Sequence, residues 1–224
     1  MSGHLIAVWI GVGICGILAL WILTLPLTGL PPRSAQFAWA RLIRCWKKPK
    51  PFTVTELCEQ SGAALLLGSK PRSQDDVKEL LAAHGGKLAI LSLNASWELA
   101  VYEDQLRDLG VTLLRLPTPD FFQPTQRAIA AGVAFTDDQL ARGNAVFIHC
   151  NAGKGRSAVV ALCFLMRTFG WTAREAYAHV LKLRRIARLD KYAGTRPQWR
   201  AILLYERRLR EEKSDFRQVA WQTP

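Results

Sequence analysis

The sequence predicts an α/β domain with a central, mostly parallel sheet flanked by helices. Four short apolar runs alternate with longer amphipathic segments after residue 51, and this alternation is typical of parallel strands joined by helices. Half of the 224 residues are hydrophobic, which is enough to build a core, so a globally disordered chain is not expected. The length suits one such domain with an appendage.

The predicted strands are short, continuous apolar runs. They cover residues 64–68, 88–93, 111–116 and 145–149. Helices are predicted between and after them, over residues 73–84, 98–109, 125–141, 157–169 and 172–187, with a last helix after Pro197. Two helix starts carry capping signals, because Ser73 precedes Asp75 and Asp76, and Thr172 with Glu175 forms a capping box.

The appendage is an uncharged apolar run over residues 5–25. Its 21 residues span roughly 30 Å as a helix, the thickness of a bilayer's hydrocarbon core. We therefore expect an N-terminal transmembrane helix within an anchor over residues 1–28. A cleavable signal peptide or transit sequence is an alternative, but the first four residues contain no Lys or Arg. A buried soluble helix is the remaining alternative.

Positive charge is concentrated directly after this run. The formal net charge is +12, and residues 1–50 hold six basic residues and no acidic one: Arg33, Arg41, Arg44, Lys47, Lys48 and Lys50. This asymmetry favours an anionic partner, either a membrane surface or nucleic acid. By the positive-inside rule, the domain lies on the cytosolic side or in an equivalent inner compartment.

Residues 29–50 are predicted to form a basic amphipathic juxtamembrane segment. Apolar residues fall at helical spacing on one face (Trp39, Leu42, Ile43, Trp46), while Arg41, Arg44, Lys47 and Lys48 occupy the other. That pattern favours a helix lying at a lipid interface, and a plain solvated linker is the alternative. Nucleic-acid binding is not expected, because no further basic-aromatic module follows.

The five cysteines are Cys15, Cys45, Cys58, Cys150 and Cys163. Their odd number and irregular spacing predict neither a disulfide scaffold nor a metal site, and no cofactor is expected. A reducing compartment is the simplest interpretation. Cys163 is expected to be packed core rather than a redox partner of Cys150.

The segment that indicates chemistry, here called the cysteine loop, covers residues 149–157 between a predicted strand and a predicted helix. A phosphate dianion needs several donors, and backbone amides of a tight loop entering a helix supply them. Gly153 and Gly155 let the backbone approach such a ligand, and Arg156 can hold two of its oxygens in a fork. The predicted phosphate-binding residues are Asn151, Ala152, Gly153, Lys154 and Gly155.

Cys150 is the candidate nucleophile of this loop. A thiol at a helix N-terminus beside cations can have its pKa lowered to about 3.5–7.5. His149 is expected to fix the loop by hydrogen bonding rather than to act as a base, and Ser157 to donate to the sulfur when it leaves. The structural alternative makes Cys150 a buried strand-end residue followed by a glycine turn. A Walker-type loop is excluded by spacing.

The string His149-Cys150, five residues, Arg156-Ser157 resembles the signature of cysteine-dependent protein tyrosine and dual-specificity phosphatases. The resemblance implies a protein-tyrosine-phosphatase-like domain in which Cys150 forms a phosphocysteine and Arg156 binds the transferred group. It also implies an acidic residue on a loop about thirty residues upstream, a place that Asp120 fills. Asp137 and Asp138 are weaker candidates within a helix, and Asp120 in a plain turn is the structural alternative.

The resemblance extends over residues 54–209 and narrows to one subgroup. Residues 65–71 resemble the opening strand of small dual-specificity phosphatases. Residues 93–98, 116–120 and 196–199 together resemble the mitochondrial phosphatidylglycerophosphate phosphatase type and its plant relatives. Asn151 stands where this family often has Lys, and Trp97-Glu98 matches part of an acidic-aromatic loop of the subgroup. The subgroup implies an anionic lipid substrate.

Residues 152–156 also resemble the loop of phosphoinositide phosphatases of the phosphatase-and-tensin type. Lys154 would then add a second cation that favours a substrate with more than one negative charge, and a solvent-facing Lys154 is the alternative. Arg184, Arg185 and Arg188 could line the same rim, although a solvated helix face is the preferred interpretation.

Together these observations predict a phosphatase domain over residues 51–212 and a C-terminal tail over residues 213–224. The expected function is hydrolysis of a phosphate monoester on an anionic membrane lipid, phosphatidylglycerophosphate or a phosphoinositide. A dual-specificity phosphatase acting on phosphoproteins and a non-catalytic phosphate-binding adaptor are the alternatives. The family likeness suggests the mitochondrial inner membrane, and the endoplasmic reticulum fits the charge pattern equally; the sequence leaves the oligomeric state open.

Overall fold

The computed structural model describes residues 32–44, 51–60, 62–184, 186 and 197–220. The expected transmembrane run over residues 5–25 lies outside them. In the described part of the chain, no helix has both the length and the apolar character needed to cross a bilayer. The chain divides into two compact units, Met1–Lys47 and Lys48–Pro224.

The first unit contains helix α2 (Arg33–Arg44). This confirms a helix in the described part of the predicted basic segment, and residues 45–50 lie outside the description. Along α2, Gln36 and Ala40 are buried, Trp39 is half-buried and Arg41 is exposed. Contact of this helix with lipid stays a prediction.

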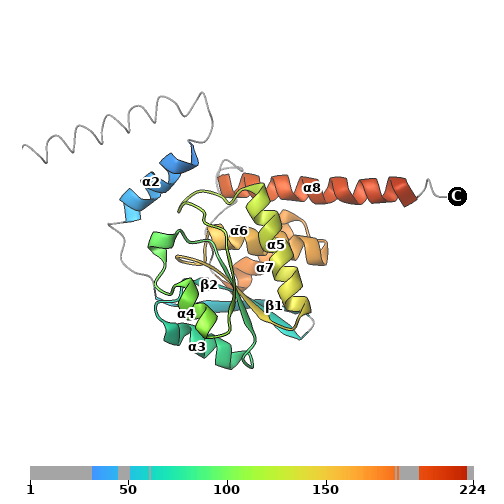
Figure 1. Ribbon diagram of the computed structural model, residues 1–224. Helices are drawn as coiled ribbons and strands as arrows, with labels where there is room; N and C mark the ends of the chain where they lie inside the picture. Colours follow the sequence, from blue (N-terminus) through green and yellow to red (C-terminus); the bar gives the residue numbers. More distant parts are fainter. Residues whose placement is uncertain (1–31, 45–50, 61, 185, 187–196, 221–224) are drawn as a thin grey trace, which may run out of the picture. The chain divides into compact units, whose positions relative to one another are not determined.

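The second unit is built on a five-stranded sheet in the order β1-β2-β5-β3-β4 (Figure 1). The strands are β1 (Val54–Gln60), β2 (Ala63–Ser69), β3 (Leu88–Ser92), β4 (Thr112–Arg115) and β5 (Ala145–Cys150). The four predicted strands are parallel to one another, as expected. Strand β1 is an antiparallel edge strand that was not predicted, because its alternating polar residues do not form an apolar run.

Helices cover both faces of the sheet (Figure 1). One face packs against helices α5, α6 and α7, with α8 packed on α6, and the other face packs against α3 and α4. Their bounds are α3 (Gln74–Ala83), α4 (Glu103–Asp108), α5 (Gln126–Ala141), α6 (Arg156–Phe169), α7 (Ala173–Leu183) and α8 (Pro197–Ala220). Every residue of α6 from Arg156 to Met166 is buried, so this helix forms the centre of the larger core.

Two helix predictions need correction. The predicted helix 98–109 is wrong in its first half, because Glu98 ends a short 3-10 turn (Ser96–Glu98) and α4 begins at Glu103. Glu98 leaves the helical path because its carboxylate is turned inward to Arg156. The predicted helix 172–187 ends at Leu183, where Arg184 takes an extended backbone conformation.

The capping predictions had mixed outcomes. The Thr172 and Glu175 capping box is present, whereas the Ser73 side chain makes no capping hydrogen bond. Asp76, in the first turn of α3, instead accepts hydrogen bonds from the backbone and guanidinium of Arg72. The boundary expected at residue 212 falls inside α8, which continues to Ala220.

Candidate active site

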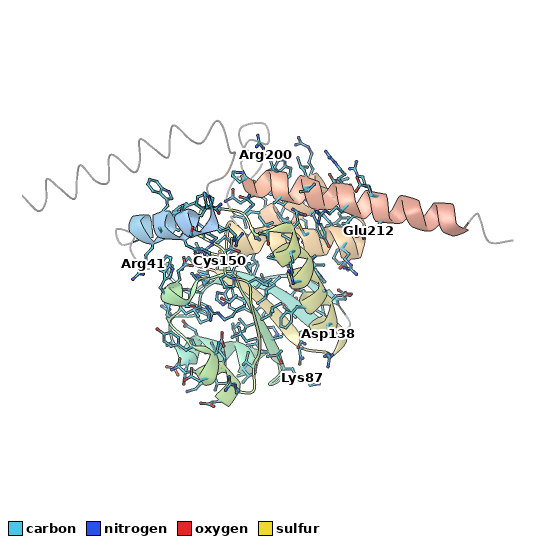
Figure 2. All side chains as sticks on the ribbon, turned by 45° about the horizontal axis from the view of Figure 1, so that its top comes forward. Arg41, Lys87, Asp138, Cys150, Arg200 and Glu212 are labelled. Atoms are coloured by element: carbon cyan, nitrogen blue, oxygen red, sulfur yellow. The ribbon has the colours of Figure 1, made fainter. Side chains whose placement is uncertain are left out.

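The cysteine loop lies where the central strand meets the central helix. Strand β5 is buried along its whole length and ends at Cys150, and α6 begins at Arg156 (Figure 2). Since β2, β3 and β5 are parallel, their carboxyl ends share one edge, which is where ligands bind in open α/β sheets. The fold therefore brings residues from β2, β3 and the segments that follow them to Cys150.

The Cys150 thiol is buried, and donors surround its sulfur. The Ser157 hydroxyl donates to Sγ over 3.2 Å. Burial by itself raises the pKa of this thiol, but the charge of Arg156, the hydroxyl and amide of Ser157 and the amide of Ala152 together lower the pKa below its ordinary value. The lowered pKa favours the thiolate, the form that a nucleophile requires.

Arg184 holds the cysteine loop from outside. Its guanidinium donates to the carbonyls of Ala152 (3.1 Å) and Gly153 (3.2 Å), and to the hydroxyls of Thr53 (2.8 Å) and Thr55 (3.1 Å) in and before β1. In a trans peptide the carbonyl and the next amide point in opposite directions. The two amides that follow these carbonyls therefore point away from Arg184, free to serve a ligand.

Gly153 is the one loop position where the backbone demands glycine. Its φ is +61°, and a Cβ there would lie 2.4 Å from the carbonyl of Gly68 and 2.8 Å from the Arg184 guanidinium. A side chain would therefore displace both the loop and the arginine that holds it. Among the other predicted phosphate-binding residues, Asn151 is buried, Ala152 and Gly155 are half-buried, and Lys154 is exposed.

Arg156 is buried and fixed by two carboxylates. Glu98 binds it in a fork, with Oε2 2.8 Å from Nη1 and Oε1 3.0 Å from Nη2, and Asp120 Oδ1 lies 3.2 Å from Nη2. Nη1 also donates to the carbonyl of Thr118 over 2.7 Å. Burial opposes the charge, but these partners raise the pKa of Arg156 above its ordinary value, so it is permanently cationic.

The Nε atom of Arg156 is buried and has no hydrogen-bond partner among the described residues. Glu98 occupies the edge of the guanidinium formed by Nη1 and Nη2. Asp120 Oδ1 approaches Nη2, and Nε, the other nitrogen of the edge formed by Nε and Nη2, has no hydrogen-bond partner among the described residues. A guanidinium edge of this kind matches two oxygens of a phosphate.

Glu98 was given no role from the sequence, but in the structure its carboxylate belongs to the hydrogen-bond network around Arg156. Besides Arg156, its carboxylate accepts from the amide of Ala95 (2.8 Å) and from the side chain of Asn151. Asn151 in turn accepts from Asn94 over 3.0 Å. The partial match of Trp97-Glu98 to an acidic-aromatic loop was the one signal in the sequence that pointed here.

The structure brings Asp120 to the site and leaves its two alternatives outside. Asp120 lies in the aspartate loop, residues 117–122 between β4 and α5, and forms the ion pair with Arg156. Asp138 instead pairs with Arg142 (2.9 Å) on the exposed side of α5. Asp137 lies on the same helix, so neither residue serves the cysteine loop.

His149 is buried beneath the loop. Its ring stacks on Phe147 with centroids 5.3 Å apart, and its carbonyl accepts from the amide of Leu93. Burial and the charge of Arg156 lower the pKa of His149 to about 3, so the imidazole is neutral. Nδ1 has no hydrogen-bond partner among the described residues, but a hydrogen bond with the backbone of Cys150 joins the His149 side chain to the loop and opposes the fall in its pKa.

The solvated helix face preferred for Arg184 is wrong, because its side chain is buried against the loop. Arg185 and Arg188 lie outside the described residues. Cys163 is free and buried in the core, where burial raises the pKa of its thiol. Within the described part of the chain, no group of three or more His, Cys, Asp or Glu side chains could hold a metal ion.

Comparison with known proteins gives a match to one family. The model of the dual specificity phosphatase catalytic domain matches residues 67–208. A phosphatidylglycerophosphate phosphatase of Arabidopsis thaliana, PTPMT1, is 29% identical over 144 residues, covering 63% of this chain and 40% of the relative. The human phosphatidylglycerophosphatase and protein-tyrosine phosphatase 1 is 31% identical over 112 residues, covering 48% of this chain and 53% of the relative. The chain thus spans about half or less of these two relatives.

Solved structures share the fold. A crystal structure of PTPMT1 superimposes with a TM-score of 0.61 at 22% identity, over 73% of this chain and 99% of that one. A second, PTPMT1 in complex with PI(5)P, gives a TM-score of 0.58 at 24% identity, over 66% and 94% of the two chains. These identities support the common fold and no more.

Proposed function

Because the chain belongs to the dual specificity phosphatase family, we propose that it hydrolyses a phosphate monoester of an anionic membrane lipid through a phosphocysteine. The observation that carries the reaction is the cluster of Cys150, Arg156 and Asp120. Arg156 lies 3.2 Å from Asp120, and the Ser157 hydroxyl lies 3.2 Å from the Cys150 sulfur. The cysteine loop and the aspartate loop thus bring a candidate nucleophile, a phosphate-binding cation and a candidate acid together.

In the first step the Cys150 thiolate attacks phosphorus, a bond from sulfur to phosphorus forms, and the ester bond to the leaving oxygen breaks. Asp120, which has to leave its ion pair with Arg156 and take up a proton from solvent before this step, gives that oxygen its proton, so the product leaves as an alcohol. The Nε–Nη2 edge of Arg156 and the loop amides bind the non-bridging oxygens, most strongly in the transition state. Glu98 holds the guanidinium of Arg156 in place by binding its Nη1–Nη2 edge, which leaves the Nε–Nη2 edge to bind the phosphate.

In the second step water attacks the phosphocysteine, Asp120 accepts its proton, and inorganic phosphate forms. The sulfur leaves as a thiolate. Ser157 donates to it, as it does to Cys150 in this structure. The same lowered pKa that makes Cys150 a nucleophile makes it a good leaving group.

The lipid substrate is supported by the relatives and by charge. Both relatives are named for phosphatidylglycerophosphate, and one matched structure is a complex with PI(5)P. The exposed Lys154 in the loop and the net charge of +12 favour anionic surfaces. A phosphoprotein substrate is the second candidate, because the human relative's name includes protein-tyrosine phosphatase.

A single-pass anchor is part of the proposal. The uncharged run over residues 5–25 and the basic residues that follow it support a retained helix with the catalytic domain on the inner side of a membrane. The relatives' names favour a membrane in which phosphatidylglycerophosphate occurs. Extraction of cell membranes with alkaline carbonate tests the anchor, since an integral protein stays in the pellet and a peripheral one is released.

The substrate is tested by phosphate release from a panel of vesicles and peptides. Vesicles carrying phosphatidylglycerophosphate or phosphoinositides are compared with phosphotyrosine and phosphoserine peptides, with Cys150→Ser as the control. We expect faster release from at least one lipid than from every peptide. Faster release from peptides would refute the lipid substrate and leave the reaction intact. No release from any substrate, including a small aryl phosphate, would support the non-catalytic adaptor.

A further inference from the structure

Three exposed apolar side chains are sequence neighbours of side chains that contact the cysteine loop or its arginine. Trp97 (38% exposed) precedes Glu98, Phe121 (42%) follows Asp120, and Leu183 (46%) precedes Arg184. Glu98 and Asp120 bind Arg156, and Arg184 binds the loop carbonyls. We call Trp97, Phe121 and Leu183 the apolar rim.

The rim residues come from three separate elements and are not parts of the core. Trp97 lies in the 3-10 turn, Phe121 in the aspartate loop, and Leu183 at the end of α7. In two cases the polar neighbour, Glu98 or Arg184, is buried while the apolar residue is exposed. This is the reverse of the usual distribution, in which the apolar side chain is buried and the charged one solvated.

Phe121 has a further feature, because its backbone lies in the left-handed region with φ at +72°. That conformation is uncommon for a bulky residue and marks a strained position. Gln198 at the start of α8 donates to the Phe121 carbonyl over 2.5 Å, while the next residue, Phe122, is buried. The local backbone thus carries one aromatic side chain outward and the next inward.

Exposed cations accompany the rim. Lys154 lies in the cysteine loop itself, and Lys182 directly precedes Leu183; both are exposed. Aromatic and aliphatic side chains interspersed with basic ones are typical of surfaces that bind the interface of a lipid bilayer. The cations meet anionic headgroups while the apolar side chains enter the boundary with the acyl chains.

We propose that the apolar rim docks the active site on the bilayer surface around the headgroup of a phospholipid substrate. This proposal rests on the lipid substrate proposed above. It adds a surface by which the cysteine loop would approach the phosphate of a lipid that stays in the bilayer. A phosphate group at a membrane surface is accessible when the loop that binds it lies against that surface. A phosphopeptide is the less favoured occupant, because the rim combines exposed apolar side chains from three elements with the exposed cations Lys154 and Lys182, a combination that suits an anionic bilayer surface.

The chain offers a matched control for this surface. Phe169 is 42% exposed, as Phe121 is, and it ends the helix whose first residue is Arg156. The 14 residues of α6 place it about 20 Å along the helix axis from the cysteine loop. Its ring stacks on Trp171, so the control changes an exposed aromatic of equal accessibility at the far end of the same helix.

The test compares a lipid with a soluble substrate in the same proteoliposomes. The full-length chain is reconstituted with phosphatidylglycerophosphate in the bilayer, and a small aryl phosphate is assayed separately. We expect the triple variant Trp97→Gln, Phe121→Gln, Leu183→Gln to lose about tenfold or more of its turnover of the lipid. Turnover of the aryl phosphate should stay within about twofold of wild type, and Phe169→Gln should match wild type on both substrates.

Other results would overturn the proposal in distinguishable ways. An equal loss on lipid and aryl phosphate would show that the rim acts through the cysteine loop, and no loss on either would show that it has no role. A selective loss on phosphopeptides would assign the rim to a protein partner. A wild-type chain that hydrolyses aryl phosphate but no lipid would instead refute the lipid substrate itself.

Discussion

Cys150 and Cys163 are two free thiols in the same hydrophobic core, and their surroundings shift their pKa values in opposite directions. Cys150 is 4% exposed and Cys163 is fully buried, so both lose contact with water. The pKa of Cys163 is raised by burial. The pKa of Cys150 is lowered, because Arg156, Ser157 and a loop amide outweigh the same burial.

This difference shows that the low pKa of Cys150 depends on the hydrogen-bond donors and the charge placed around its sulfur, and not on burial. Cys163 lies midway along α6 among apolar side chains, where nothing stabilises a thiolate. Cys150 lies at the N-terminal end of the same helix, where amides and the helix dipole favour negative charge. Removing one donor at a time from around Cys150 should therefore move it toward the behaviour of Cys163.

The largest effect is expected when the sulfur of Cys150 is replaced by oxygen, and the same replacement at Cys163 is the control. Cys150→Ser should lower kcat by about 10⁶-fold, as loss of a catalytic nucleophile does elsewhere, whereas Cys163→Ser should stay within about twofold because it changes one buried atom. Phosphate release from an aryl phosphate measures both. A comparable loss in the Cys163 variant would contradict the distinction drawn between the two thiols.

Arg156 supplies a positive charge that lowers the pKa of Cys150. Arg156→Lys keeps the charge but loses the fork that binds Glu98 on one edge and phosphate on the other, so kcat should fall about 10³-fold. Arg142→Lys, which changes an exposed arginine paired with Asp138, is the control and should leave kcat unchanged. Near-normal turnover by the Arg156 variant would mean that the guanidinium does not bind the transferred group.

We expect Asp120 to act on the leaving oxygen rather than on the sulfur. Asp120→Asn should lower the hydrolysis of an alkyl phosphate about 10²-fold, and that of a nitrophenyl phosphate much less, because nitrophenolate leaves without a proton. Asp138→Asn serves as the control. Equal losses on both substrates in the Asp120 variant would show that another residue is the acid.

Arg184 should have the smallest effect on rate and a distinct effect on pH dependence. Removal of its charge in Arg184→Met should raise the pKa of Cys150, so the acid limb of the rate profile should move to higher pH, with a loss of about tenfold at neutral pH. Arg174→Met, at an exposed position of α7, should leave the profile in place. A lower rate with an unmoved profile would limit Arg184 to a structural role.

The sequence was sufficient to predict the part of the site that lies in one continuous segment, the cysteine loop. Cys150, Arg156 and Ser157 belong to one loop between a strand and a helix, so their convergence was predictable. Asp120 was predicted because the resemblance to the phosphatase family implies an acid about thirty residues upstream. The four apolar strands were predictable for the same local reason. Edge strand β1 was not, because its polar alternation resembles a surface segment.

Glu98 and Arg184 were not predictable, because their roles come from contacts between distant parts of the chain. Glu98 meets Arg156 across 58 positions, and Arg184 meets Gly153 across 31. In the sequence, Glu98 looks like an ordinary helix residue and Arg184 like part of a basic helix face. In the structure both side chains are buried, because Glu98 binds Arg156 and Arg184 binds the carbonyls of the cysteine loop.

The most direct test of the account is the titration of the Cys150 thiol. The rate of alkylation by iodoacetamide is followed from pH 5 to 10 by peptide-level mass spectrometry, which separates Cys150 from Cys58, whose pKa is raised to about 11, and from Cys163. Because the thiolate alone reacts and forms above the pKa, Cys150 should alkylate with a midpoint well below the ordinary value of about 8.5, and phosphate should protect it. A midpoint at or above 8.5, with no protection, would contradict the central claim that the loop ionises this sulfur.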